Sequence, residues 1–360
     1  MTSASIAIVG IGTWLPETVR TNDAWPRSFG ERASAKGDRT FNDIPPCEDM
    51  EAAAIVARDL EAETRDPFLG AKSRRVADAS TTAAQAEGSA ALAALRDAGI
   101  APGDVDLVLS YSIVPDRLTP STATSVAHAI GASRAVAFGI DAACASSITQ
   151  LDIARAYVAA GLARTVLLVQ SHLLLRAIEL EHPASPGLGD GATAMVVTAG
   201  TGLTIRSTFS VTHGDQATAV TWVRGQDDAT DLPWWKAGGD FRPGSRAPER
   251  VKTLMRDTVT YGAATIRAAA ERGSVSVADL GVIASVQPRG FIPHAIAERL
   301  GLPRSCAVTT YEDIAHLGAC GPVFNLARAR SLGRTSRGSL IALYGQGAGF
   351  TRAAAILEAG

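Results

Sequence analysis

The chain carries a weak internal repeat, and this repeat limits the possible folds more than any single segment does. In the first copy, an apolar run at 105–117 ends in proline and charged residues, and a helix-like stretch follows. Residues 278–289 begin a second copy with the same order. Each copy leads through a further apolar segment into a turn of small residues, at 141–147 and at 316–321. Two such units related by a pseudo-twofold axis predict a ligand cleft between the halves, at the carboxyl ends of the strands.

Short apolar runs alternate with longer alanine-rich stretches, a pattern typical of α/β proteins with largely parallel, buried sheets. The candidate strands are rich in Val, Ile and Leu, and they are 6–9, 107–113, 136–140, 166–169, 194–197, 282–286, 307–310 and 340–344. One helix is expected to begin at a cap on Thr81 or Thr82 and to end at Gly99. Another is expected to begin just after Cys144 and to end at Gly161.

The length of 360 residues fits two domains or one duplicated domain, since domains commonly hold roughly 100–200 residues. We expect an N-terminal half at 1–200, with an irregular insert at about 29–66, and a C-terminal half at 201–360. A loop at about 216–248 carries the tryptophans Trp222, Trp234 and Trp235. Such a loop could cover a substrate tunnel or form a surface that binds a partner. The alternative is a solvent-exposed loop held in place by buried tryptophans.

Charge and cysteine content exclude several classes of function. The formal net charge of -2, from 34 basic and 36 acidic side chains, argues against a nucleic-acid or anionic-membrane partner. No apolar run reaches the roughly 20 residues that span a bilayer, and the N-terminus lacks the basic region of a signal peptide. The cysteines are far apart, so we expect a cytoplasmic protein without a disulfide framework or metal site. They are Cys47, Cys144, Cys306 and Cys320.

Cys144 is the most specific chemical signal in the chain. It follows a candidate strand, lies among alanines and serines, and directly precedes an amphipathic helix. Backbone N–H groups at a helix start favour negative charge, so a thiol held there is biased toward the nucleophilic thiolate. The small neighbours would let a thioester reach the sulfur. Taken alone, a lone cysteine is more often an inert core residue, and the surrounding motifs reverse that balance.

Further motifs follow one another in a fixed order, and they are 10–17 with 21–22, 70–75, 141–144, 187–192 and 345–351. Together they resemble the β-ketoacyl-acyl-carrier-protein synthase III group of the thiolase superfamily, over about residues 5–358. This resemblance implies a duplicated five-layer α-β-α-β-α core, a homodimer and an acyl group carried on Cys144. The donor it implies is an acyl-coenzyme A or acyl-carrier-protein thioester, which is a substrate, so no separate cofactor is expected.

The resemblance also assigns an oxyanion hole, formed by the backbone N–H groups of Cys144 and Ala348. Two fixed backbone donors would stabilise the charge that develops on a thioester oxygen without reorganising. The alternative is that Gly345, Gly347 and Gly349 only permit a tight turn, and both statements can hold together. Gly347 and Trp222 are further candidates for substrate binding.

The sequence departs from the family pattern at two catalytic stations. Condensing enzymes of the family place a histidine after the second-half strand and an asparagine about thirty residues later, where the pair stabilises an enolate. Here Gln287 occupies the position that matches the family histidine, subject to a one-residue gap, and His316 occupies the position that matches the asparagine. His316 would then act as the base, with Glu312 or Asp313 orienting its ring. A buried turn histidine bonded to backbone is the alternative.

The remaining candidates carry weaker signals. The family asparagine expected just after the histidine station is not recognisable, and Arg289 in that region either contacts a donor phosphate or carboxylate or is a surface arginine. Three other histidines are in segments that could approach the cleft, and they are His172, His182 and His213. His128 and His294 are in the repeated helices and are expected to be structural or exposed.

Three functions are compatible with these residues. The first is transfer of an acyl group from Cys144 to an oxygen or nitrogen nucleophile of a small-molecule acceptor, as in specialised metabolism, and the altered histidine–asparagine pair favours it. The second is decarboxylative carbon–carbon condensation, with Gln287 and His316 in exchanged roles. The third is a non-catalytic partner in a dimer, against which the intact motif around Cys144 argues.

Overall fold

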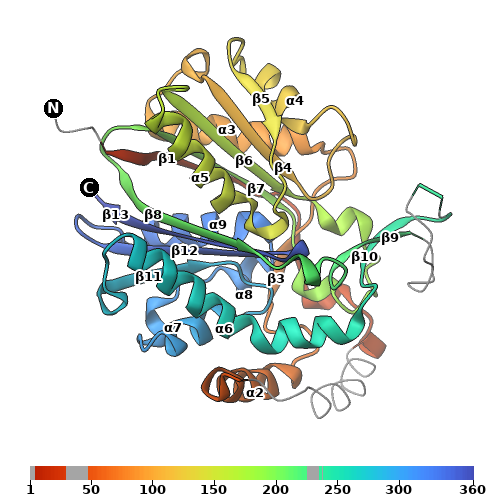
Figure 1. The fold of residues 1–360 in the computed structure, drawn as a ribbon. Coiled ribbons are helices and arrows are strands. Elements are labelled where there is room, and N and C mark those ends of the chain that lie inside the picture. Colours follow the sequence, from red (N-terminus) through yellow and green to blue (C-terminus); the bar gives the residue numbers. More distant parts are fainter. Residues whose placement is uncertain (1–4, 30–47, 225–234, 237) are drawn as a thin grey trace.

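The computed structural model describes residues 5–29, 48–224, 235–236 and 238–360, and it contains two successions of strands and helices with the same order (Figure 1). The first succession is β1 (Ile6–Trp14), α3 (Ala83–Ala98), β4 (Leu107–Ser112), α4 (Thr122–Ile130), β5 (Val136–Gly139), α5 (Ser146–Ala159), β6 (Thr165–His172) and β7 (Gly191–Ala199). The second is β8 (Leu203–Thr212), α6 (Pro248–Arg272), β11 (Leu280–Ser285), α7 (Ile292–Arg299), α9 (Gly321–Ser331), β12 (Leu340–Gly347) and β13 (Thr351–Ala359). The boundary near residue 200 stays a prediction.

Within the described residues, hydrogen bonds order the strands of the large sheet as β11-β12-β13-β8-β1-β7-β6-β4-β5. The halves join where β1 and β8 pair, at Ala7–Thr204 and Ile8–Leu203. Strands β4–β5, β4–β6 and β11–β12 are parallel, whereas β6–β7 and β12–β13 are antiparallel. The expectation of largely parallel sheets was therefore wrong, because no helix crosses over between β6 and β7 or between β12 and β13.

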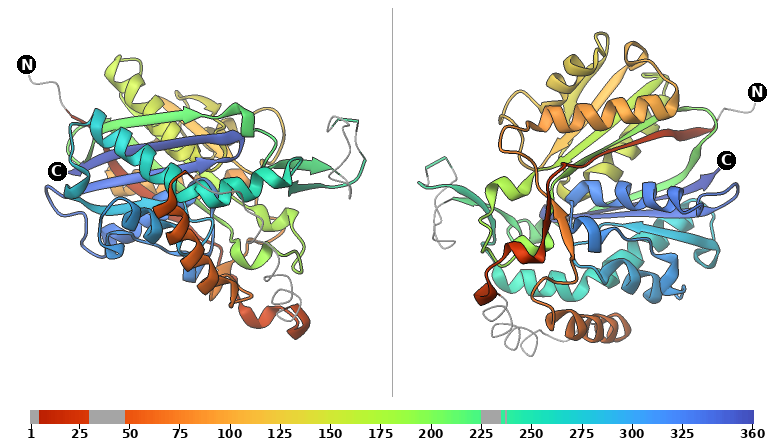
Figure 2. Two further views of the ribbon diagram at one scale, coloured as in Figure 1. Left: turned by 60° about the horizontal axis from the view of Figure 1, so that its bottom comes forward. Right: turned by 180° about the vertical axis from the view of Figure 1, so that it is seen from behind.

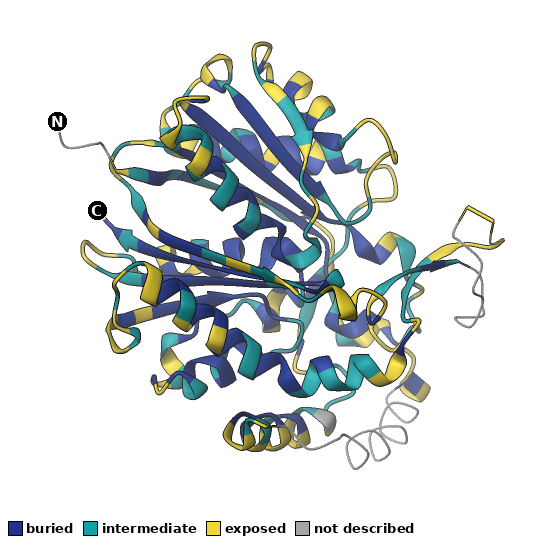
Figure 3. Ribbon diagram, in the orientation of Figure 1, coloured by how far each residue is buried: buried dark blue, intermediate teal, exposed yellow. Residues whose placement is uncertain are grey.

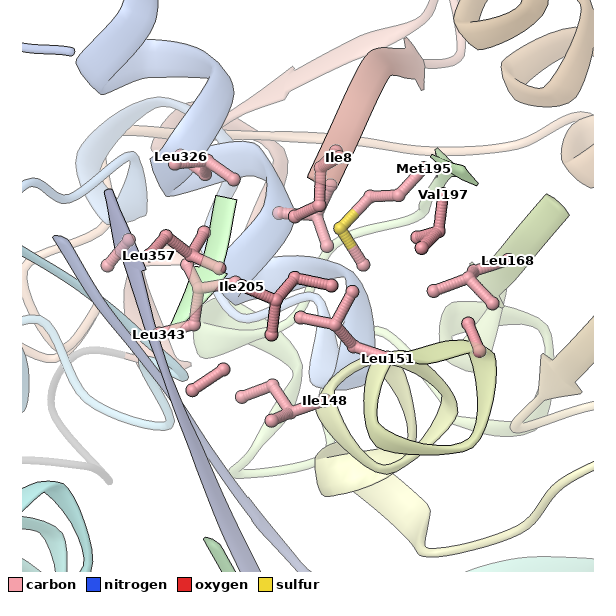
Figure 4. Close-up of a cluster of buried hydrophobic side chains, with 14 of the residues drawn as sticks. Ile8, Ile148, Leu151, Leu168, Met195, Val197, Ile205, Leu326, Leu343 and Leu357 are labelled. Atoms are coloured by element: carbon pink, nitrogen blue, oxygen red, sulfur yellow. The ribbon is translucent and has the colours of Figure 1, made fainter. Parts of the chain in front are cut away.

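The elements stack in five layers, as the turned views of Figure 2 show. Helices α3 and α4 cover the outer face of the first half, and α6 and α7 cover that of the second. Between the halves, α5 and α9 contact strands of both. Side chains of this middle layer, such as Leu151 and Leu326, pack against Ile8, Leu168 and Leu343 in the core (Figure 4). The predicted five-layer α-β-α-β-α core is confirmed.

Local signals explain several of the elements. Helix α3 begins at a capping box in which Thr82 and Gln85 bond each other's backbone, and it ends at Gly99 with φ 65°. The expected strand 307–310 is reduced to one bridge between Ile283 and Ala307. This bridge occupies the place that β5 has beside β4 in the first half. Strands β8 and β13 were not predicted, although both are central in the sheet; β13 is largely buried, whereas β8 mixes buried with exposed residues (Figure 3).

The insert contributes a helix, α2 (Met50–Thr64), which packs on α6 and α7. Two early motifs meet where β2 (Val19–Thr21) pairs with β3 (Ser73–Arg75) and the guanidinium of Arg74 donates to Asn22 at 2.6 Å. The flanks of the aromatic loop form a hairpin of β9 (Thr221–Arg224) and β10 (Phe241–Gly244), while Trp234 and Cys47 are outside the described residues. Among the described helices, none is both long and apolar enough to cross a membrane.

Candidate active site

Cys144 is at the junction between the two halves. It is in a 3-10 turn, Ala143–Ala145, that runs directly into α5, and Ala143 has a left-handed φ of 49°. Its part-buried side chain opens onto a cavity of about 520 Å³. The closing loop packs against this turn, since a Cβ on Gly347 would be 2.0 Å from the carbonyl oxygen of Ala142. The structure therefore places the predicted helix start, directly after Cys144, at the predicted cleft.

His316 reaches this sulfur from the other half of the chain. Its Nε2 is 3.9 Å from Sγ of Cys144, so the two turns singled out by the internal repeat do meet. The backbone of His316 is fixed by the glycine turn of the first half: its N–H donates to Gly187, and its carbonyl accepts from Gly189. The motif at 187–192 therefore positions the imidazole beside the thiol.

The charges of this pair differ from the sequence-based expectation. Burial, assisted by the carboxylate of Asp141, raises the pKa of Cys144 to about 12. Burial and the nearby His172 lower the pKa of His316 to about 3. Both shifts oppose a resting thiolate, because burial and Asp141 outweigh the helix-start amides. They favour a neutral thiol beside a neutral imidazole.

The orienting carboxylate expected for His316 is also missing among the described residues. Nδ1 of His316 is buried without a hydrogen bond of good geometry, although the backbone of Gln287 is close enough to favour its protonation. Glu312 pairs with Lys72 at 2.7 Å, and its side chain and that of Asp313 point away on the exposed side of the turn. The main chain of His316 is fixed by backbone hydrogen bonds, and no carboxylate among the described residues orients its ring.

Gln287 does not have the role predicted for it. Its side chain is fully buried outside the cavity lining, and the amide donates to Thr310 and to the carbonyl of Ala315. Its oxygen accepts from Thr309 and Asn325. The preceding residue, Val286, lines the cavity instead, because successive side chains at a strand end point to opposite faces. The hydrogen bonds of Gln287 stabilise the turn before His316. The cavity wall carries the apolar side chain of Val286 at the place where a hydrogen-bond donor was expected.

The remaining site predictions have mixed outcomes. Trp222, Gly347 and Ala348 all line the cavity with Cys144 and His316. The role of Ala348 as the second oxyanion donor stays a prediction.

Arg289 is outside the cavity lining and pairs with Glu63 of α2 at 2.8 Å. Glu63 of the insert therefore pairs with this arginine, for which contact with a donor phosphate or carboxylate was one of two alternatives. Within the described part of the chain, no group of three or more His, Cys, Asp or Glu side chains is arranged to hold a metal ion.

Sequence reasoning missed the importance of His172, although it placed this residue in a segment that could approach the cleft. His172 ends β6, is 1% exposed and lines the same cavity. Its ring centroid is 5.6 Å from that of His316 in an edge-on arrangement. His172 forms a hydrogen bond with Gly189 in the glycine turn. No local sequence pattern predicts that these two residues are paired. The imidazoles of His172 and His316 therefore lie together beside the thiol, and His182 lines the same cavity.

Comparisons with known proteins agree with this arrangement. Residues 138–215 match the 3-oxoacyl-(acyl-carrier-protein) synthase III family, and residues 270–359 match the C-terminal part of that family. The β-ketoacyl-(acyl-carrier-protein) synthase III of Rhodospirillum centenum is 30% identical over 319 residues, which cover 86% of this chain and 96% of that protein. The Bordetella petrii protein of the same name is 28% identical over 355 residues, 98% of this chain and 96% of that protein.

The solved structures include the synthase III of Thermus thermophilus, with a TM-score of 0.76 and 26% identity over 98% of this chain and 99% of that one. A duplicated five-layer core with a cysteine at the start of a central helix defines a thiolase-fold enzyme. Given this fold and the extent of the sequence identity, the chain belongs to the β-ketoacyl-acyl-carrier-protein synthase III family.

Proposed function

We propose that this family member is an acyltransferase that takes an acyl group from an acyl-coenzyme A or acyl-carrier-protein thioester and passes it to an oxygen or nitrogen nucleophile. We place that reaction in specialised metabolism. The observation that carries the proposal is the cavity wall at Val286, where the expected second polar group is absent. The imidazoles of His316 and His172 remain as bases in the cavity of Cys144, and a base is what an alcohol or amine acceptor requires.

In the first half-reaction, Sγ of Cys144 attacks the donor carbonyl carbon while its proton passes to Nε2 of His316. Backbone N–H groups of Cys144 and Ala348 would stabilise the oxyanion that forms. Collapse breaks the donor carbon–sulfur bond, and the departing thiolate takes the proton from His316. In the second half-reaction the acceptor attacks the acyl-enzyme, the bond to Sγ breaks, and an ester or amide leaves with Cys144 restored as a thiol.

The cavity is suited to the donor's acyl chain. Its lining is largely apolar away from the thiol and imidazoles, and it includes Ile113, Leu174, Ile178, Leu188, Leu254 and Met255. The hairpin of β9 and β10 supplies Trp222 and Pro243 to the same wall. An apolar wall of this kind stabilises an aliphatic chain by removing it from water.

Decarboxylative condensation is the second candidate, and the names of the relatives favour it. The curated relatives that cover most of this chain are called β-ketoacyl-acyl-carrier-protein synthases. Condensation produces an enolate when a malonyl thioester loses carbon dioxide, and that anion needs fixed donors. Val286 offers none, and the amide of Gln287 is bonded to Thr310 and Ala315. These contacts support acyl transfer over condensation.

Incubation of the acylated enzyme with a malonyl thioester distinguishes the two candidates. We expect the native chain to release no carbon dioxide above background. The double variant Val286→His/His316→Asn restores a histidine and an asparagine at the cavity and is expected to gain release by at least about tenfold, because each restored donor contributes to enolate stabilisation. Liberated carbon dioxide and the ketoacyl product are measured together. Efficient condensation by the native chain would refute the acyltransferase proposal.

A homodimer is part of the proposal. Strand β5 is at the edge of the large sheet, and Val136 on it is 62% exposed. An exposed edge strand offers unpaired backbone groups to a second copy. We expect sedimentation to give twice the chain mass of 37.2 kDa and Val136→Lys to shift the equilibrium toward monomer. Leu162→Lys, at a turn residue that is 71% exposed, serves as the control, and a dimer equally stable in both variants would place the interface elsewhere.

A further inference from the structure

We propose that His172 is the base that accepts the acceptor's proton, so that the two imidazoles divide the two half-reactions between them. This inference rests on the proposed acyl transfer and adds a residue that neither the family resemblance nor the fold assigns. His316 would serve the acylation of Cys144, and His172 would serve the attack on the acyl-enzyme.

The hydrogen bonding of His172 fixes its tautomer. Its Nδ1 is 2.7 Å from the carbonyl oxygen of Gly189. A carbonyl oxygen can only accept, so Nδ1 carries the proton and Nε2 presents its lone pair. The pKa of His172 is lowered to about 4 by burial, which keeps this neutral form at neutral pH.

Nε2 of His172 has no hydrogen-bond partner among the described residues, although the side chain is 1% exposed. A buried polar atom without a partner is unusual and needs a reason, because leaving it unpaired is unfavourable. The atom belongs to a residue that lines the cavity of Cys144 and His316. A substrate hydroxyl or amine in that cavity would supply the missing donor.

Gly318 shows how close the imidazole and the thiol come. A Cβ on this residue would be 2.6 Å from Cδ2 and 3.3 Å from Nε2 of His172. The same Cβ would be 3.5 Å from Sγ of Cys144. Both side chains therefore lie close to Gly318, where any larger residue would collide with the imidazole. An acceptor that attacks an acyl group on Sγ approaches from the cavity that both residues line.

The proton balance of the second half-reaction closes with His172 as the base. After acylation, His316 has given its proton to the leaving thiol and Sγ no longer carries one. When an acceptor X–H attacks the acyl carbon, a bond from X to carbon forms and the proton of X–H passes to Nε2 of His172. The carbon–sulfur bond then breaks, and the thiolate of Cys144 recovers that proton. The product is an acylated X, and both imidazoles end neutral.

The test separates acylation from deacylation. His172→Asn places an amide N–H near the position of Nδ1, so the contact to Gly189 is kept while the basic nitrogen is removed. We expect Cys144 to be acylated by an acyl-coenzyme A at a rate within threefold of the native chain, as followed by intact-mass spectrometry. Deacylation by 1-butanol, which needs a base, is expected to slow by about 100-fold. Deacylation by hydroxylamine, a stronger nucleophile, should change far less.

Controls keep the outcomes distinct. His128→Asn, at an exposed residue outside the cavity, should behave as the native chain. His172→Gln provides a second variant if the asparagine variant does not fold, as judged by its thermal unfolding. Equal slowing of acylation and deacylation, or native deacylation by 1-butanol in a folded variant, would overturn the role of His172. If the native chain transfers acyl groups to neither alcohols nor amines, the proposed function itself fails.

Discussion

Replacement of His316 by alanine should slow the acylation of Cys144 by a factor of about 10²–10⁴, the contribution typical of a positioned general base. The resting thiol has a pKa raised to about 12, so it is almost entirely protonated at neutral pH. Nε2 of His316, at 3.9 Å, is the basic atom placed to receive its proton. Without it, solvent must remove the proton. Intact-mass spectrometry of the acyl adduct over time measures the rate.

The pH dependence of acylation supports the same prediction. Groups near His316 are His172, Cys144 and Tyr111, with Asp141 beside the thiol, and burial raises the pKa of Tyr111 well above its usual value. Because the lowered pKa keeps His316 neutral, native acylation should persist below the ordinary histidine pKa of about 6.5 and fall only as pH approaches about 3. In the alanine variant the rate should rise about tenfold per pH unit, because the thiolate fraction does.

Two controls separate this outcome from trivial ones. His128→Ala removes an exposed histidine and should leave acylation unchanged. Cys144→Ala should abolish the adduct, since it removes the nucleophile. Native acylation in a folded His316→Ala variant would remove His316 from the mechanism. No adduct on the native chain across a broad panel of acyl thioesters would favour the non-catalytic dimer partner.

The layered fold could be predicted because it depends on patterns that recur along the chain. The internal repeat correctly placed β4 before α4 and β11 before α7, and the cap signals correctly placed α3. The antiparallel partners β8 and β13 were missed, because each follows the preceding strand, β7 or β12, with no α-helix between them to mark a new element. The strand expected at 307–310 has the right composition but makes one bridge. Pairing across the sheet, which sequence does not display, decided these cases.

The site was predictable only in part, and one residue of register explains the main error. Cys144 and His316 were placed correctly beside each other from motifs on opposite halves. Beyond the end of β11, successive side chains point to opposite sides of the chain, so moving by one residue changes which side chain faces the cavity. Val286 lines the cavity, and Gln287 is buried on the other side. His172 was not singled out because its importance depends on Gly189 and Gly318, both distant in sequence.

The glycine–aspartate turn links the imidazoles of His172 and His316. Gly189 accepts from Nδ1 of His172 through its carbonyl and donates through its N–H to the carbonyl of His316. Asp190 accepts from the backbone of Ala77 and Leu175, which fixes the turn in place. A single backbone segment of the first half therefore sets the positions of imidazoles from both halves.

Gly347→Ala is expected to slow acylation of Cys144 by at least about 100-fold, the effect of displacing a reactive group by about 1 Å. Gly347 has φ -111°, an extended conformation that any residue adopts, so a tight turn is not the reason for glycine here. A Cβ would be 2.0 Å from the carbonyl oxygen of Ala142 and 3.0 Å from the backbone nitrogen of Cys144. Those backbone atoms cannot yield without moving the nucleophile and its oxyanion donor.

Gly103→Ala is the matched control, because a Cβ there would meet nothing within 4 Å and the residue is exposed. It should acylate at the native rate, and acylation is again followed by intact mass, with thermal unfolding recorded for both variants. Gly349 differs from Gly347, since its φ of 112° does require glycine and its Cβ would meet nothing within 4 Å. Native acylation by Gly347→Ala would mean that the closing loop can retreat from Cys144, and a loop that retreats could not hold Ala348 as a fixed oxyanion donor.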